Sequence, residues 1–185
     1  MLHDPAVAWV FTVIFGATGV YSVVLTIIDR RLIERVMHGL HILMSLAMIA
    51  MAWALSVPTL PQVLVFSIGA LYCAAIWVRS LLRGGTGIAE HPPWMLGYHA
   101  LMMLAMVWMV APGTAGQHVT LPAALAATGA LGAAGLYAGV AVAVADAAVC
   151  LVRRPPRTAL HVSDDVSTAA MGIGMGAMTL AMAFA

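Results

Sequence analysis

The chain has 185 residues, of which 63% are hydrophobic and only 8% are charged. This composition excludes a soluble domain and is typical of an integral membrane protein. The formal net charge is +1, and no basic run suggests a nucleic-acid partner. The length predicts a single membrane domain, residues 1–185. The N-terminus lacks the basic start of a cleavable signal peptide, so we expect the first apolar segment to remain as a helix.

Six apolar segments are long enough to cross a bilayer as helices. They are separated by short stretches rich in Arg, Pro or Gly, which interrupt helices. We expect helices at about residues 9–28, 36–57, 62–82, 94–110, 121–152 and 166–185. The sequence therefore predicts an all-α fold, an integral membrane six-helix bundle in contact with the lipid bilayer.

The arginines predict the orientation of this bundle. All eight basic residues are Arg, and they follow the first, third and fifth apolar segments: Arg30, Arg31, Arg35, Arg79, Arg83, Arg153, Arg154 and Arg157. The positive-inside rule then places these links in the cytoplasm and both termini outside it, in a plasma-membrane protein. In that topology the second, fourth and sixth helices run parallel to one another.

These same three segments carry histidine followed by methionine at helical spacing. Thirteen of the 14 methionines lie in them or at their edges, whereas the other three segments, equally hydrophobic, have none. Simple hydrophobic filling would have spread methionine over all six. The candidate site residues are His38, His41, Met44, Met48, Met51, His99, Met102, Met106, Met109, His161, Met171, Met175, Met178 and Met182.

The chemistry of these side chains favours a soft metal. Thioethers bind Cu(I) and have little affinity for hard cations, and imidazole also suits copper. We call the row of His and Met along one face of each of these three helices a stripe. The three stripes therefore predict a Cu(I) protein for copper transport, storage or delivery to an extracytoplasmic cuproenzyme. The alternative interpretation is packing, because methionine is also a flexible filler of apolar cores at helical spacing.

Two further functions stay open at this point. Histidines on three helices would permit one b-type haem with bis-His or His/Met ligation, which predicts an electron carrier. A cofactor-free accessory subunit of a respiratory or cuproenzyme complex, or a homo-oligomer, is the other alternative. The sequence has no phosphate loop, zinc-protease motif or nucleophile with a nearby base, so we expect no enzyme.

The remaining polar and small residues have ordinary interpretations beside functional ones. Asp146 is expected to pair with Arg153 or Arg154, and otherwise to serve as a counter-charge for a bound cation. Asp164 is expected near the start of the sixth helix, where it would cap the helix or hold a metal beside His161. Two GxxxG spacings, in the fifth and sixth segments, predict close helix packing. Both cysteines, Cys73 and Cys150, are expected to be small buried hydrophobes.

The three His/Met motifs also carry a resemblance. With them, the chain resembles an actinobacterial family of small multi-pass membrane proteins described as a domain of unknown function. That resemblance covers nearly all of the chain and implies no particular activity. In its style of ligands alone, the chain is similar to the CopD and CtaG types of copper membrane protein.

Overall fold

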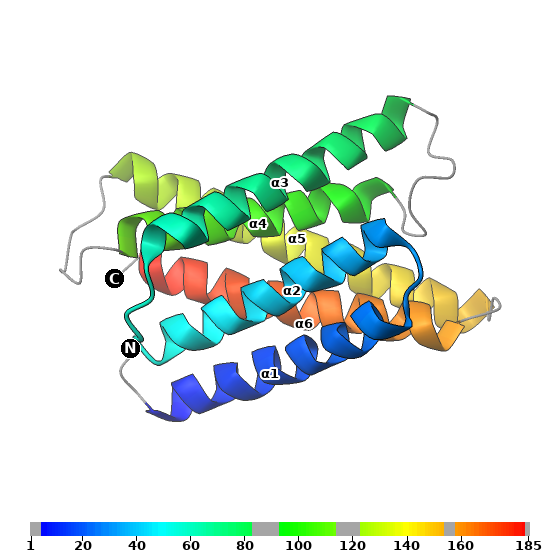
Figure 1. The fold of residues 1–185 in the computed structure, drawn as a ribbon, viewed down its shortest axis with the longest axis horizontal. Helices are drawn as coiled ribbons and strands as arrows, with labels where there is room; N and C mark the ends of the chain where they lie inside the picture. Colours follow the sequence, from blue (N-terminus) through cyan, green and yellow to red (C-terminus); the bar gives the residue numbers. More distant parts are fainter. Residues whose placement is uncertain (1–4, 83–92, 114–122, 154–157, 184–185) are drawn as a thin grey trace.

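The structure, a computed structural model, describes residues 5–82, 93–113, 123–153 and 158–183. This part of the chain forms six helices and confirms the predicted all-α fold (Figure 1). The helices are α1 (Pro5–Ile28), α2 (Leu32–Ala52), α3 (Thr59–Leu82), α4 (Pro93–Gly113), α5 (Ala123–Arg153) and α6 (Thr158–Ala183).

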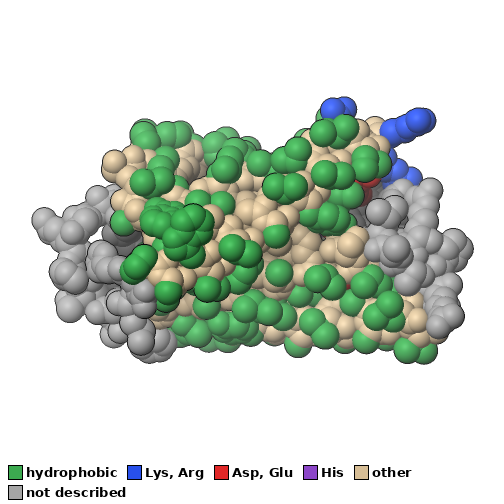
Figure 2. Space-filling model, turned by 90° about the horizontal axis from the view of Figure 1, so that it is seen from below, with side chains coloured by type: hydrophobic (Ala, Val, Ile, Leu, Met, Phe, Trp, Pro, Cys, Tyr) green, Lys and Arg blue, Asp and Glu red, His purple; other side chains and the backbone are tan. Residues whose placement is uncertain are grey.

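Each of the six helices contains an apolar stretch long enough to cross a membrane. On the face shown in Figure 2, apolar side chains cover most of the surface, and the basic side chains gather at one end. An apolar belt with charge confined to its end is what a lipid environment requires. The fold therefore fits a multi-pass membrane protein.

Consecutive helices pack most closely, as three hairpins: α1 with α2, α3 with α4, and α5 with α6 (Figure 1). Because the chain reverses at every link, α2, α4 and α6 run in the same direction, as predicted. Helix α6 also contacts both α1 and α4, which joins the hairpins into one bundle. The start of α1 and the end of α6 lie at the same end of this bundle.

Two helix boundaries differ from those expected. Helix α2 ends at Ala52 rather than near residue 57, because Trp53 caps it with an N–H donated to the carbonyl of Ile49 at 3.1 Å, and Ala54 then takes a positive φ of 49°. Helix α6 begins at Thr158, eight residues before the expected start at 166. Asp164 is therefore the seventh residue of α6 instead of a residue at its start, and helix capping cannot be its role.

The glycine spacings predicted close helix packing, and α5 and α6 do form a close pair. The structure shows that these glycines also leave room for a side chain from a third helix. The ring of Tyr98, on α4, occupies the room beside Gly139 of α5 and Gly172 of α6, where a Cβ atom would collide with it. Its hydroxyl donates a hydrogen bond to the carbonyl of Leu136 at 3.1 Å. These glycines therefore accept an aromatic side chain from a third helix and fix α4 against the α5–α6 pair.

Candidate functional site

Methionine side chains from α2, α4 and α6 form one buried cluster in the centre of the bundle, which we call the thioether core. Each of its members is at most 1% exposed. The thioether core consists of Met44, Met48, Met102, Met103, Met106, Met109, Met171, Met175 and Met178. The three stripes of the sequence therefore converge on one another.

The thioether core has a partly exposed fringe at its far end. Met51 and Met182 are half-buried and pack against it. Both lie near the ends of their helices, away from the histidines. Because α2 and α6 are parallel, the sulfurs extend along the bundle axis over roughly 15 Å, at about 1.5 Å of helix rise per residue.

Two histidines lie at the opposite end of the thioether core. The rings of His41 and His99 stack with their centroids 4.7 Å apart and an angle of 30° between their planes. Both side chains are 4% exposed. Each precedes the first core methionine of its helix by one turn, so the imidazole pair and the thioethers form one continuous buried set.

A hydrogen bond determines which ring nitrogen of His99 carries the proton. The Nδ1 atom of His99 lies 2.6 Å from the carbonyl oxygen of Met95. A carbonyl only accepts, so Nδ1 must carry the proton, and in the neutral ring Nε2 is then the nitrogen with the lone pair. Histidines that bind metals commonly donate their other ring N–H to a carbonyl in this way.

Two buried hydroxyl groups lie on the helices that form the thioether core. Ser45 lies beside Met44 on α2, and Thr168 lies one turn before Met171 on α6. The two side chains are 2% and 1% exposed, and within the described residues their hydroxyl oxygens have no hydrogen-bond partner. Buried hydroxyls are normally satisfied by protein, water or a ligand. The Ser45 side chain lies beside Gly19 of α1, so this hydroxyl is at the contact between α1 and α2.

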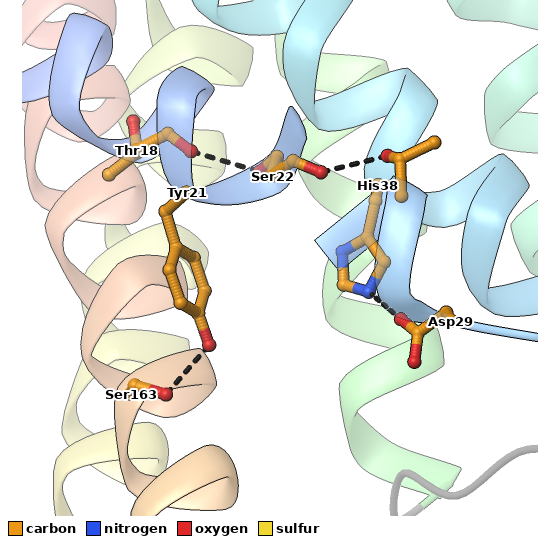
Figure 3. Close-up of polar contacts among 7 residues, drawn as sticks. Thr18, Tyr21, Ser22, Asp29, His38 and Ser163 are labelled. Carbon is orange, nitrogen blue, oxygen red and sulfur yellow. Dashed lines mark hydrogen bonds and ion pairs between the residues drawn. The ribbon is translucent and has the colours of Figure 1, made fainter. Parts of the chain in front are cut away.

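The other histidine of α2 has a different environment. His38 Nε2 lies 2.8 Å from the carboxylate of Asp29, in the link between α1 and α2 (Figure 3). Nearby, the hydroxyls of Tyr21 and Ser163 are 2.7 Å apart and join α1 to α6. These contacts form a polar layer between the imidazole pair and the end of the bundle, and they hold His38 away from the thioethers.

The structure describes both aspartates that were expected near the site, but not the side chains of all their expected partners. Asp164 is 8% exposed on α6, in the same end of the bundle as Ser163. Asp146 is half-buried on α5, while the side chains of its expected partners, Arg153 and Arg154, lie outside those the structure describes. The side chain of His161 also lies outside them. In the described residues, no three His, Cys, Asp or Glu side chains form a group that could hold a metal ion.

Two buried methionines and one contact between sulfur atoms were missed in the sequence, whereas Cys73 is buried as expected and Cys150 is half-buried. Met103 belongs to the thioether core although it lies off the predicted stripe, because α4 is enclosed on several sides. Met37 and Cys73 meet in a separate cluster, with their sulfur atoms 3.6 Å apart. The excess of methionine on α4 was a signal for the first, but nothing in the spacing paired a cysteine of α3 with a methionine of α2.

Fold and site together define the class: a six-helix protein of membrane type whose centre is lined by thioethers and imidazoles. The chain belongs to the family described as DUF5134, a domain of unknown function, whose model matches residues 33–182. This confirms the predicted family resemblance. The similarity in style to CopD and CtaG proteins gains no support from these comparisons.

Similar proteins occur in mycobacteria. The uncharacterised proteins Rv0970 of Mycobacterium tuberculosis and Mb0995 of Mycobacterium bovis are each 35% identical to this chain over 117 residues. The matched region is 60% of this chain and 51% of each relative, so the chain matches about half the length of these relatives. No solved structure matches the chain.

Proposed function

We propose that this protein binds Cu(I) in the thioether core and transports, stores or delivers copper across or within the plasma membrane. One observation carries the proposal: thioethers from three helices that are not consecutive gather in a single buried cluster that adjoins a pair of imidazoles. Helices α1, α3 and α5 contain no methionine among their described residues.

The donor set fits a soft, singly charged ion. The thioethers select Cu(I) over Zn²⁺ and Mg²⁺, while neutral imidazole binds Cu(I) as well as Zn²⁺. A cation in an apolar interior is costly unless its ligands replace its water. The residues that would hold copper are His41 and His99 at one end of the core and the methionines beyond them.

The length of the thioether core supports movement of the ion. Its sulfurs lie at several depths along three parallel helices, so one ion would meet a succession of equivalent donors. The positive-inside rule assigns the arginine-bearing end to the cytoplasm. The imidazoles then lie on the cytoplasmic side and the half-buried Met51 and Met182 on the outer side. Delivery to an extracytoplasmic cuproenzyme would follow this direction.

The imidazole stack gives the haem alternative less support. Two axial histidines hold an iron between them at about 2 Å from each nitrogen, with the macrocycle separating the rings. His41 and His99 instead lie face to face with 4.7 Å between their centroids, which leaves no space for a macrocycle between them. The accessory-subunit alternative predicts no bound copper at all and is separated by the experiment below.

The test compares metal binding in variants that keep the packing. Met48, Met106 and Met175 contribute one thioether from each helix, and changing all three to Leu conserves volume well. The detergent-purified protein is titrated with Cu(I) under reducing conditions against a competing Cu(I) chelator. We expect the triple variant to bind Cu(I) at least 100-fold more weakly than the natural chain.

A matched control uses Met95→Leu. Met95 is also on α4 and is 1% exposed, but it lies outside the thioether core. We expect this variant to bind Cu(I) as the natural chain does. Equal Cu(I) affinity in the natural chain and the triple variant would contradict the proposal. Absence of any chelator-resistant copper in the natural chain would also contradict it and favour the accessory subunit.

A further inference from the structure

A hollow on the outer surface of the bundle lies between α2 and α3, and we call it the α2–α3 groove. It is lined by the second half of α2, the end of the link that follows and the first turns of α3. The two helices are consecutive in the chain but belong to different hairpins (Figure 1). Ala47 and Ala50 of α2 contribute only methyl groups here, and a space of about 380 Å³ remains between the hairpins.

The α2–α3 groove opens onto the apolar surface of the protein. Three of its lining residues, Leu43, Leu46 and Val65, are 46%, 59% and 39% exposed. Among the described residues that line the groove, Gln62 alone has a polar side chain. Because the groove is continuous with the surface that suits a lipid environment, its occupant comes from the hydrocarbon of the bilayer and not from water.

The dimensions of the groove select one kind of occupant. From Leu43 to the end of α2 at Ala52, the helix rises roughly 14 Å, which is close to half the thickness of a hydrocarbon core. A volume of about 380 Å³ over that length corresponds to a width of roughly 6 Å. An extended hydrocarbon chain is about 4–5 Å across, because carbon atoms in contact lie near 4 Å apart. A helix with its side chains needs about 10–12 Å. The groove therefore admits one acyl chain from one leaflet and excludes a helix of another protein.

The polar end of the groove lies where the membrane surface is expected. Gln62 is in the first turn of α3, at the end of the bundle opposite the arginines of α2 and α3. Trp53, 39% exposed, directly follows α2 at the same end, and tryptophan is typical of the membrane interface. The Gln62 amide donates only a long hydrogen bond, 3.4 Å, to the carbonyl of Pro58. It can instead donate to an ester carbonyl of a lipid whose chain enters the groove.

We propose that the α2–α3 groove binds one acyl chain of a membrane phospholipid, with the ester groups beside Gln62 and the end of the chain beside Leu43. The chain fills the space that Ala47 and Ala50 leave open. It thereby joins the α1–α2 hairpin to the α3–α4 hairpin through dispersion contacts, which drive helix association in a membrane. This inference rests on the shape and lining of the groove and does not depend on copper.

The bound chain also covers one side of the thioether core. Phe66 of α3 is 2% exposed and belongs to the same buried cluster as the core methionines, and Ala47 packs against that cluster. Both residues also line the α2–α3 groove. The acyl chain therefore lies against the side chains that enclose the thioethers and separates this part of the core from mobile lipid.

The test uses the full chain purified in a mild detergent, which replaces the lipid that surrounds the protein. The probe is a phosphatidylcholine that carries a photoactivatable diazirine in one acyl chain. Phosphatidylcholine has no net charge, so its binding does not report the arginines. Labelled residues are mapped by mass spectrometry of peptides. We expect saturable labelling of residues 43–50 and 61–66, about fivefold or more above the exposed faces of α1 and α5.

Ala50→Phe fills the groove with a ring and should lower this labelling about tenfold or more. Ala75→Phe is the matched control, because Ala75 is exposed on α3 but does not line the groove. It should leave the labelling unchanged. Unsaturable labelling spread evenly over the exposed faces of the natural chain would refute the proposal, and this result needs no variant that folds. Equal labelling of Ala50→Phe and the natural chain would also refute it.

Two further results separate this inference from its rivals. A groove filled by a second copy of the chain would exclude the probe from α2 and α3 and give a dimer in the native mass spectrum, which would refute lipid binding. The triple variant of Met48, Met106 and Met175 should keep the lipid labelling while it loses Cu(I). Failure of the copper proposal therefore leaves the lipid site standing, and failure of the lipid site leaves the copper proposal standing.

Discussion

Helices α2, α4 and α6 differ from α1, α3 and α5 in what they bury. In the most apolar stretch of each helix, 39%, 61% and 56% of the residues are buried in the even-numbered set, against 22%, 28% and 17% in the odd-numbered set. The odd-numbered helices are also the more hydropathic set, as suits helices that bury less of their surface inside the bundle. The even-numbered helices form an inner layer, and the odd-numbered helices face the lipid.

Both layers satisfy polar groups within and between helices. On α1, the hydroxyl of Ser22 donates to the carbonyl four residues earlier at 2.9 Å, and on α4 a ring nitrogen of His99 makes the same kind of local contact at 2.6 Å. Between helices, the hydroxyls of Tyr21 and Ser163 are 2.7 Å apart, and the rings of His41 and His99 stack. The contacts between helices make both layers depend on the assembled bundle.

The largest effect should come from filling the space beside Gly172, where the Tyr98 ring packs α4 against the α5–α6 pair. In Gly172→Ala, the new methyl group collides with the hydroxyl of Tyr98 and crowds Val140. Overpacking of this kind costs about 1–3 kcal/mol, and the hydrogen bond from Tyr98 to Leu136 would be strained as well. We expect the midpoint of thermal unfolding in detergent to fall clearly.

Gly132→Ala is the control for this prediction, since within the described residues nothing lies within 4 Å of the position of its new Cβ. It should be neutral or slightly stabilising, because alanine favours helix over glycine. Adding Tyr98→Phe to Gly172→Ala should recover part of the loss by removing the colliding oxygen. Equal effects of the two glycine changes would show that Tyr98 does not fix α4 in this way.

A smaller effect should come from the imidazole stack. Because the rings of His41 and His99 are in contact, changing either to Ala should remove most of the benefit of the other. In a double-mutant cycle on the free energy of unfolding, we expect a coupling of about 0.5–1.5 kcal/mol, as for other ring pairs. Strict additivity would mean that the stack contributes no stability to the inner layer.

The smallest effect should come from the polar layer at the end of the bundle. The contact between His38 and Asp29 joins α2 to the link before it, and the carboxylate side is 33% exposed. Partly solvated pairs contribute roughly 0.2–1 kcal/mol. We expect Asp29→Asn to lower the free energy of unfolding by less than 1 kcal/mol and to leave Cu(I) affinity unchanged. A marked loss of copper binding would mean that His38 belongs with the core.

Much of this arrangement could be predicted from the sequence. Apolar length gave six helices, and the reversal of the chain at each link gave three parallel helices with their methionines at matching depths. The ends of helices were less predictable, because hydropathy does not report backbone conformation. The positive φ of Ala54 ended α2 early, and the polar first turns of α6 began it at Thr158, well before its apolar stretch.

Contacts between helices were the part that periodicity could not supply. A helical pattern shows which residues share a face but not what that face meets. Two contacts depend on how the hairpins pack against one another. One is the sulfur contact between Cys73 and Met37, and the other is the position of the Tyr98 ring beside Gly172. The convergence of the three stripes required the same three-dimensional information, although their parallel direction made it plausible.

X-ray absorption at the copper edge tests the central claim most directly. A variant of the full chain with Cys73→Ser and Cys150→Ser would be loaded with one equivalent of Cu(I), so that sulfur neighbours of the ion come only from methionine. We predict a first shell dominated by sulfur at about 2.3 Å, with at most a minor nitrogen contribution from imidazole. A shell of only nitrogen and oxygen neighbours would contradict the account and return the methionines to a packing role.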